Sequence, residues 1–200
     1  MSNTQFYKSF KLNENSFSSV NELIAFSKTI SLDIYSFFMN WFNKNDFIEV
    51  KTSGSTGAPK TIQLKKEFMK NSALATGAFF NLKENTKALL CMSPKYIAGK
   101  MMLVRAIELG WNLDVVEPSS NPLNNIGKHY DFSAMVPLQL MNSLTKIHKI
   151  KKLIVGGGVV SEELFAKIQD SEIEIFATYG MTETITHIAV KKLNNFKNVI

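Results

Sequence analysis

The run 52-TSGSTGAPK-60 combines hydroxyl side chains, glycines and a lysine, as an anion-binding loop requires. It follows the apolar run 47-FIEV-50, which predicts a strand that ends where the loop begins. Gly54 and Gly57 permit close backbone approach, so consecutive N–H groups can surround an anion, and Lys60 adds a positive charge. The loop therefore suits a polyphosphate. Its polar and glycine residues are Thr52, Ser53, Gly54, Ser55, Thr56, Gly57 and Lys60.

The spacing of this loop excludes one common phosphate-binding pattern. A Walker loop needs G-x-x-x-x-G-K followed by Ser or Thr, whereas this loop reads G-x-x-G-x-x-K. Composition alone also fits a flexible Ser/Gly loop without a ligand. The strand predicted before the loop, and the Pro59–Lys60 pair behind it, favour an ordered phosphate-binding loop.

Two further segments carry chemistry after predicted strands. In 178-TYGMTET-184, the ring of Tyr179 can stack on a base, the threonines can donate to phosphate, and Glu183 can hold Mg²⁺. The alternative is a surface turn with a capping threonine. In 156-GGG-158 the glycines leave a strand end bare, which suits a flat ligand or, alternatively, a loose connection between strand and helix.

The elements that must position these loops alternate between strand and helix. This order predicts an α/β fold with a largely parallel sheet flanked by helices, in which ligands bind beyond the carboxyl ends of strands. We therefore expect the three loops to meet at one edge of one sheet. The predicted strands are 47–53, 62–64, 87–93, 112–118, 132–136, 151–157, 173–180 and 185–193. The predicted helices begin near 20, span 32–42, 65–80, 98–109 and 137–147, and begin at 161.

The 200 residues, with 45% hydrophobic and 20% charged side chains, fit one sizeable folded domain, or one domain with an appendage. We assign 1–45 to a helical N-terminal extension packed on the core and 46–200 to the α/β core. The net charge of +6 comes from scattered lysines, which fits a solvated surface or attraction of anionic ligands. Because no basic stripe is present, nucleic acid is not an expected partner.

The sequence also indicates the cellular compartment in which the protein is expected. Cys91 is the single cysteine, so a disulfide within the chain is impossible and a reducing compartment is indicated. The polar N-terminus has no signal-peptide pattern, and the apolar run 30–42 is too short and too polar to span a bilayer. We predict a soluble cytoplasmic protein without a membrane partner. The sequence indicates no oligomeric state.

The phosphate loop and the YGMTE run at 179–183 together resemble the signatures of the adenylate-forming, or AMP-binding, superfamily, which includes acyl-CoA and aryl-CoA synthetases. The resemblance implies the fold of the large N-terminal domain of these enzymes, without their small C-terminal domain. It implies that the hydroxyls of 52–56 and Lys60 wrap the ATP phosphates, with Gly54 and Gly57 as hinges. It also places Tyr179 against adenine, Thr182 at the α-phosphate and Glu183 on Mg²⁺. Gly156, Gly157, Gly158 and Gly180 complete the implied nucleotide site, and Lys60, Thr182 and Glu183 are the implied catalytic residues.

The segment 93-SPKYIAGKMMLVRAIELGW-111 resembles the acyl-pocket region of o-succinylbenzoate–CoA ligases of menaquinone biosynthesis. The pattern there is P-x-F-H-I-S-G followed by a helix with an arginine; here Tyr96 replaces the His and Ala98 the Ser. The planar fork of Arg105, the one arginine in the sequence, suits a carboxylate. The alternative is a surface pair with Glu108. The predicted substrate-binding residues are Tyr96, Gly99, Arg105 and His187.

The implied reaction joins an acid to coenzyme A through an acyl-adenylate, with ATP, Mg²⁺ and CoA as small-molecule partners. The acid is expected to be o-succinylbenzoate, an aromatic dicarboxylate. The alternatives are another aryl or acyl carboxylate, or a nucleotide-binding module without activity. Family members also carry a ribose-binding Asp, a hinge and a C-terminal domain with a catalytic Lys. None of these has a match here, so the chain alone is expected to be inactive or weakly active.

Overall fold

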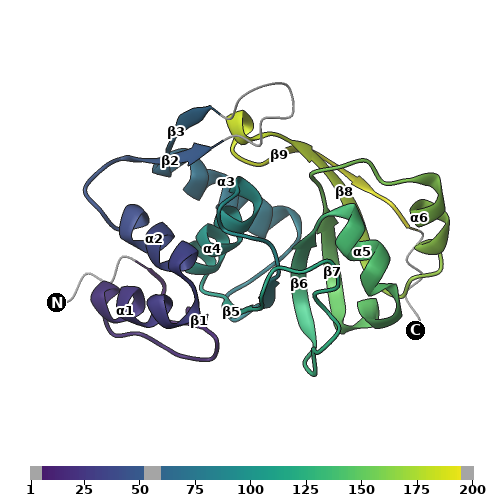
Figure 1. Ribbon diagram of the computed structural model, residues 1–200, viewed down its shortest axis with the longest axis horizontal. Coiled ribbons are helices and arrows are strands. Elements are labelled where there is room, and N and C mark those ends of the chain that lie inside the picture. The colour runs from purple at the N-terminus through teal and green to yellow at the C-terminus, as the bar shows by residue number, and fades with distance from the viewer. Residues whose placement is uncertain (1–5, 52–59, 195–200) are drawn as a thin grey trace.

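A seven-stranded sheet, seen in the computed structural model of residues 6–51 and 60–194, forms the centre of the protein (Figure 1). Its strand order is β1-β5-β4-β6-β7-β8-β9, and every neighbouring pair is parallel except β8 with β9. The α/β class predicted from the alternating pattern is therefore confirmed. The strands are β1 (Lys11–Leu12), β4 (Lys87–Leu90), β5 (Asn112–Val115), β6 (Tyr130–Met135), β7 (Ile150–Val155), β8 (Glu174–Gly180) and β9 (His187–Lys192).

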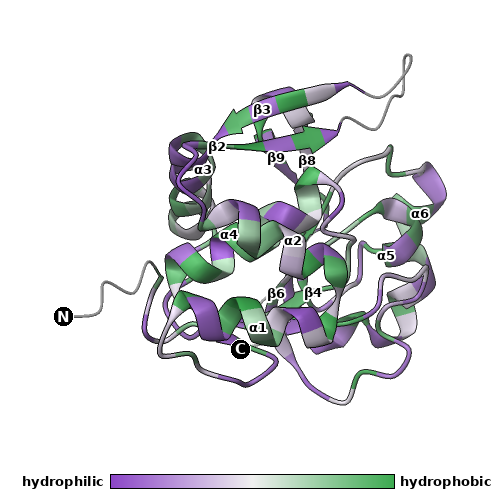
Figure 2. Cartoon of the chain, turned by 60° about the vertical axis from the view of Figure 1, so that its left-hand side comes forward, coloured by the Kyte–Doolittle hydropathy of each residue, from purple (hydrophilic) through white to green (hydrophobic). Residues whose placement is uncertain are grey.

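Helices cover both faces of this sheet because its strands are apolar on both sides. Side chains of successive strand residues point to opposite faces. In β4, Ala88 and Leu90 pack with α1–α4, whereas Leu89 packs with α5 and α6. Figure 2 shows hydrophobic and hydrophilic stretches alternating along these helices. The helices are α1 (Val20–Ile30), α2 (Leu32–Trp41), α3 (Lys66–Phe79), α4 (Ile97–Leu109), α5 (Pro137–Ser143) and α6 (Glu162–Lys167), with the 3-10 helices η1 (Leu144–Lys149) and η2 (Thr182–Thr184).

Local sequence signals set the helix ends as predicted. Ser19 and Ser31 cap α1 and α2, and Ser161 caps α6 by accepting a hydrogen bond from the N–H of Leu164 at 3.2 Å. Gly110 ends α4 with φ +67°, a left-handed conformation that glycine adopts without strain. Three serine caps and the glycine stop thus mark four of the helix boundaries.

The strand before the phosphate loop does not belong to the main sheet. β2 (Phe47–Lys51) pairs antiparallel with β3 (Thr61–Lys65) in a separate two-stranded sheet. The expectation that the strand before this loop belongs to the same sheet as the strands before the other two loops is therefore wrong. Only nine residues separate β2 from β3. A parallel connection needs a crossover of a dozen or more residues, so a hairpin is the arrangement that this length permits.

Two other elements differ from the prediction. The helix expected over 137–147 ends at Ser143 and continues as η1, a tighter 3-10 helix. The two-residue strand β1 was not predicted, because so short a segment has no periodicity; it pairs with β5 at one side of the main sheet.

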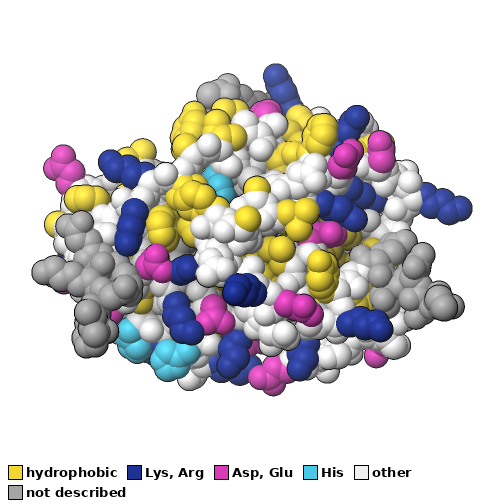
Figure 3. Space-filling model, turned by 180° about the vertical axis from the view of Figure 1, so that it is seen from behind, with side chains coloured by type: hydrophobic (Ala, Val, Ile, Leu, Met, Phe, Trp, Pro, Cys, Tyr) yellow, Lys and Arg dark blue, Asp and Glu magenta, His cyan; other side chains and the backbone are white. Residues whose placement is uncertain are grey.

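The surface carries charges of both signs. On the face shown in Figure 3, Lys and Arg side chains are interspersed with Asp and Glu side chains. Exposed pairs such as Lys151–Asp131, with 2.7 Å between nitrogen and oxygen, are typical of a solvated surface. Across the two described ranges, no helix has the length and apolarity needed to cross a membrane.

Candidate functional site

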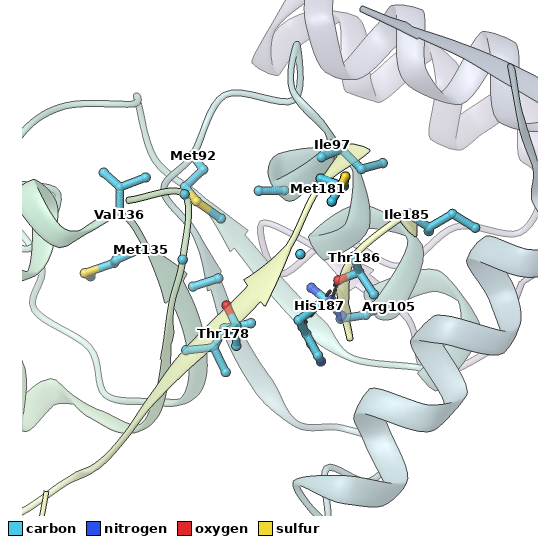
Figure 4. Close-up of a pocket in the computed structure, with 16 residues that line it drawn as sticks. Met92, Ile97, Arg105, Met135, Val136, Thr178, Met181, Ile185, Thr186 and His187 are labelled. Carbon is cyan, nitrogen blue, oxygen red and sulfur yellow. Dashed lines mark hydrogen bonds between the residues drawn. The ribbon is translucent and has the colours of Figure 1, made fainter. Parts of the chain in front are cut away.

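A cavity of about 150 Å³ opens beyond the carboxyl ends of the central parallel strands, next to α4 (Figure 4). This is the place where open α/β sheets bind ligands. Its wall is mostly apolar, with four polar or charged side chains among the glycines. The apolar residues are Met92, Ile97, Ala98, Ala134, Met135, Val136, Ile154, Met181 and Ile185. The others are Arg105, Gly156, Gly157, Thr178, Gly180, Thr186 and His187.

The end of β7 has glycines because its neighbour approaches closely. A Cβ atom on Gly156 would lie 2.6 Å from the hydroxyl oxygen of Thr178. That hydroxyl donates a hydrogen bond to the carbonyl of Val155 at 3.2 Å, which ties the ends of β7 and β8 together. Gly157 has φ +74°, a conformation that favours glycine. Gly158 is exposed and does not belong to the cavity wall.

The turn after β8 folds back tightly against the strand. A Cβ atom on Gly180 would lie 2.2 Å from the carbonyl oxygen of Thr186. The hydroxyl of Thr184 donates to the carbonyl of Thr186 at 2.8 Å and accepts from the N–H of Met181 at 3.0 Å. These contacts place the start of β9 in the cavity wall. Glycine is required at position 180 because the returning backbone occupies the space of a side chain.

Arg105 is the most unusual residue of the cavity. It is 2% exposed, and one Nη donates a hydrogen bond to the Thr186 hydroxyl at 2.8 Å. Its Nε has no hydrogen-bond partner among the described residues. Burial lowers the pKa of Arg105 to about 10, which still leaves the guanidinium charged at neutral pH.

The alternative reading of Arg105, as a surface pair with Glu108, is wrong. The carboxylate of Glu108 lies 3.5 Å from the ammonium group of Lys70 on α3. Arg105 faces the cavity, whereas Glu108 faces the neighbouring helix. Within the described part of the chain, Arg105 is thus a buried cation without a salt-bridge partner, and such a cation attracts an anionic ligand.

His187 lies beside this arginine. Its Nδ1 is 3.3 Å from the Thr186 hydroxyl oxygen, and its ring meets the ring of Phe80 edge-on, with 6.4 Å between centroids. Burial, and secondarily the charge of Arg105, lower the pKa of His187 to about 4. The imidazole is therefore neutral at pH 7.

The lowered pKa of His187 gives a testable pH dependence. The unfolded chain binds this proton near pH 6.5 and the folded chain only near pH 4, so stability falls as pH decreases through this window. Because the ring is partly exposed, we expect a loss of about 1–2 kcal/mol rather than the full value of the shift. Urea unfolding between pH 7 and pH 4 should show a shallower decline for His187→Gln. His129→Gln, at an exposed position, is the matched control; equal slopes for wild type and His187→Gln would contradict the prediction.

Other residues predicted for the substrate lie elsewhere. Tyr96 precedes α4, is 56% exposed and lines a separate surface hollow next to α2 and β2. Gly99 is buried in the first turn of α4, where a Cβ atom would lie 2.4 Å from the carbonyl oxygen of Ser93. Gly99 therefore allows α4 to pack on the preceding loop, and it does not belong to the cavity wall.

Most of the residues predicted to bind the nucleotide do not line the cavity. The predicted loop residues 52–57 lie outside the described residues. Lys60 is exposed just before β3. Tyr179 and Glu183 are exposed and Thr182 is half-buried in η2, all outside the cavity wall. In the parts of the chain that the structure describes, no three His, Cys, Asp or Glu residues come together as a metal site.

Sequence reasoning missed several residues of the cavity. Thr186 was not singled out, although its position directly before His187 and just after the motif was a usable signal. The apolar wall from Met92 and Ile97 could not be distinguished from ordinary core positions. Thr178 was seen only as part of the motif, and its hydrogen bond to the end of β7 depends on strand pairing.

The fold and the cavity define the class of protein: an α/β protein with a cavity at the carboxyl ends of parallel strands whose wall includes a buried cation. The chain belongs to the AMP-binding enzyme family, which matches residues 51–198. This confirms the resemblance to the adenylate-forming superfamily.

Relatives of known type are similar to this chain over much of its length. The 2-succinylbenzoate–CoA ligase of a Geobacillus species is 25% identical over 162 residues, which covers 76% of this chain and 33% of that protein. The 2-succinylbenzoate–CoA ligase of Bacillus subtilis is 25% identical over 144 residues, covering 68% and 30%. The chain thus spans about a third of the length of these curated relatives.

Solved structures agree with the fold. An acyl-CoA synthetase (AMP-forming)/AMP-acid ligase II-like protein from Dyadobacter fermentans is 40% identical, with a TM-score of 0.75 over 82% of this chain and 49% of that one. The o-succinylbenzoate coenzyme A synthetase of Bacillus subtilis, solved with ATP and magnesium ion, is 24% identical, with a TM-score of 0.65 over 72% and 32%. The second likeness shows the fold alone.

Proposed function

We propose that this chain forms the acyl-adenylate site of an AMP-forming acid–CoA ligase whose acid is o-succinylbenzoate. The observation that carries the proposal is the buried charge of Arg105 in the wall of an apolar cavity, which has no salt-bridge partner among the residues that the structure describes. An aromatic dicarboxylate has one carboxylate to activate and a second that needs a cation. The methionine and isoleucine side chains of the wall suit its ring. Similarity to 2-succinylbenzoate–CoA ligases supports the choice of acid.

In the proposed reaction, a carboxylate of the acid attacks the α-phosphate of ATP and pyrophosphate leaves. The thiol of CoA then displaces AMP from the acyl-adenylate. Such chemistry depends mainly on positioning and on stabilising charge. We assign the phosphates to Lys60 and the loop 52–57, the α-phosphate to Thr182 and adenine to Tyr179. Lys60 and Tyr179 are exposed, which leaves them accessible to a nucleotide.

Magnesium fits the same proposal. Mg²⁺ commonly binds through one or two carboxylates together with substrate phosphates, so the single exposed carboxylate of Glu183 is a sufficient protein ligand. When bound, the ion would offset the negative charge of the phosphates. A cytoplasmic location and a role in menaquinone biosynthesis are part of this proposal.

Calorimetric titration with acyl-sulfamoyl-adenosine analogues tests the proposed acid. The o-succinylbenzoyl analogue carries a second carboxylate, whereas the benzoylpropionyl analogue lacks it and is otherwise matched. We expect the first to bind about 10–100-fold more tightly, the range for a hydrogen-bonded charge pair. Arg105→Met should remove the difference.

The outcomes separate the alternatives. Equal affinity of the two analogues would reject o-succinylbenzoate and favour another aryl or acyl carboxylate. Absence of binding by both would reject an adenylate site. Lys100→Met is the matched control, because Lys100 is a cation on the same helix and its ammonium group contacts backbone carbonyls outside the cavity. This variant should still bind the analogue with the second carboxylate more tightly.

A further inference from the structure

The segment between η2 and β9 contains a strained turn. Ile185 has φ +71° and ψ −47°, and the N–H of Thr186 donates to the carbonyl of Thr184 at 2.8 Å. These are the features of a γ-turn with positive φ, which is rare and strained, and unusual for a β-branched residue. Such strain persists only where surrounding contacts hold it. Here the turn brings the Thr186 hydroxyl to Arg105.

Thr186 connects the two polar groups of the cavity. Its hydroxyl accepts a hydrogen bond from the Arg105 guanidinium at 2.8 Å and lies 3.3 Å from Nδ1 of His187 (Figure 4). A guanidinium can only donate, whereas a hydroxyl has one proton to give. Among the described residues, the Nδ1 of His187 is the acceptor within reach of that proton.

The direction of the hydrogen bond between Thr186 and His187 follows from the one between Arg105 and Thr186. If Nδ1 carried the proton, two donors would converge on one hydroxyl oxygen, and the hydroxyl proton would lack an acceptor in a partly buried site. The positive charge of Arg105 also turns the hydroxyl proton away from itself and toward the ring. The Thr186 hydroxyl therefore donates to Nδ1, which leaves the ring proton of neutral His187 on Nε2.

We propose that Thr186 is a positioning residue that fixes His187 as the Nε2–H tautomer, so that the cavity offers a neutral donor beside Arg105 to the second carboxylate of the acid. The recognition step rests on the proposed function, whereas the tautomer does not. Phe80, directly after α3, and Arg105 on α4 lie near the ring, and Arg105 is the charged one of the two. One charged and one neutral donor suit a carboxylate and repel a cationic group.

Nitrogen NMR of the ligand-free protein tests the tautomer directly. The sequence has three histidines, and His187→Gln identifies the signals of His187 by their loss. At pH 7 we expect a single Nε2–H tautomer in the wild type and in Thr186→Ser, which keeps the hydroxyl. Thr186→Val keeps the shape but removes the hydroxyl, and should give a mixture of tautomers. An Nδ1–H tautomer in the wild type, or an unchanged tautomer in Thr186→Val, would overturn the proposal.

Titration with the o-succinylbenzoyl-sulfamoyl-adenosine analogue tests the recognition step. We expect Thr186→Val to weaken binding about tenfold and Thr186→Ser to restore most of it. Unchanged affinity in Thr186→Val would overturn the role of the tautomer in recognition. If the wild type does not bind this analogue, the proposed function fails while the NMR result still decides whether Thr186 sets the tautomer.

Discussion

Arg105→Met is expected to make the ligand-free protein more stable while removing its ability to select a second carboxylate. Arg105 is buried, and the burial that lowers its pKa to about 10 disfavours the charged form by about 3 kcal/mol. Methionine is flexible and apolar, and it can fill similar space among Met102 and the other side chains around α4. Replacing buried charges by apolar groups stabilises proteins by about 1–4 kcal/mol in favourable cases. We expect a gain in this range.

Urea unfolding at pH 7 measures the gain, and Lys100→Met is the matched control on the same helix. The Lys100 ammonium group donates to the carbonyls of Pro94 at 2.5 Å and Lys95 at 3.4 Å. Its removal leaves these carbonyls without that donor, so the control should be destabilised or unchanged. A clear loss of stability in Arg105→Met would contradict the prediction. It would show that the arginine is retained for the structure and not for a ligand.

A variant that gains stability while it loses ligand binding is a strong physical sign that the replaced residue belongs to a binding site. A residue that costs folding free energy and lines a cavity is retained when it serves a ligand. Accordingly, the wild type should gain thermal stability when an analogue with two carboxylates is added, since a ligand that binds the native state stabilises it. Arg105→Met should gain far less from the same analogue.

Gly180→Ala is expected to have the opposite effect and to weaken both folding and binding. The added Cβ would lie 2.2 Å from the carbonyl oxygen of Thr186 and 2.7 Å from the Cα of His187. Both are backbone atoms, so no side-chain rotation can relieve the overlap. The β9 strand would have to shift away from β8 at the register irregularity between Tyr179 and Gly180. We expect a loss of about 3 kcal/mol, at the upper end for added core volume.

The same shift should disturb the cavity. Moving the Thr186 backbone displaces its hydroxyl from Arg105, and the 2.8 Å hydrogen bond between them would lengthen. Gly127→Ala is the matched control, because a Cβ atom there would meet nothing within 4 Å. Urea unfolding and calorimetric titration of both variants test the prediction. If Gly180→Ala unfolds like Gly127→Ala, the turn is more adaptable than the contacts indicate.

The sequence by itself determined most of the helices and strands and the class of protein. The alternation of apolar strands with capped helices predicted the α/β fold, because caps such as Ser161 and stops such as Gly110 act within a few residues. The signatures at 52–60 and 179–183 indicated the AMP-binding family, which the match over residues 51–198 confirms. Each of these signals lies within a few consecutive residues, so it can be recognised without the tertiary structure.

Only the tertiary structure decided which residues meet. Whether Arg105 pairs with Glu108 or faces a cavity depends on how α4 packs against α3, and no spacing within the helix reveals it. The separation of the β2–β3 hairpin from the main sheet likewise came from pairing between strands. Thr186 joins Arg105 across 81 positions of sequence through a strained turn. Long-range contacts of this kind arise from the packing of whole elements, which is why the sequence could name Arg105 and His187 but not the hydroxyl between them.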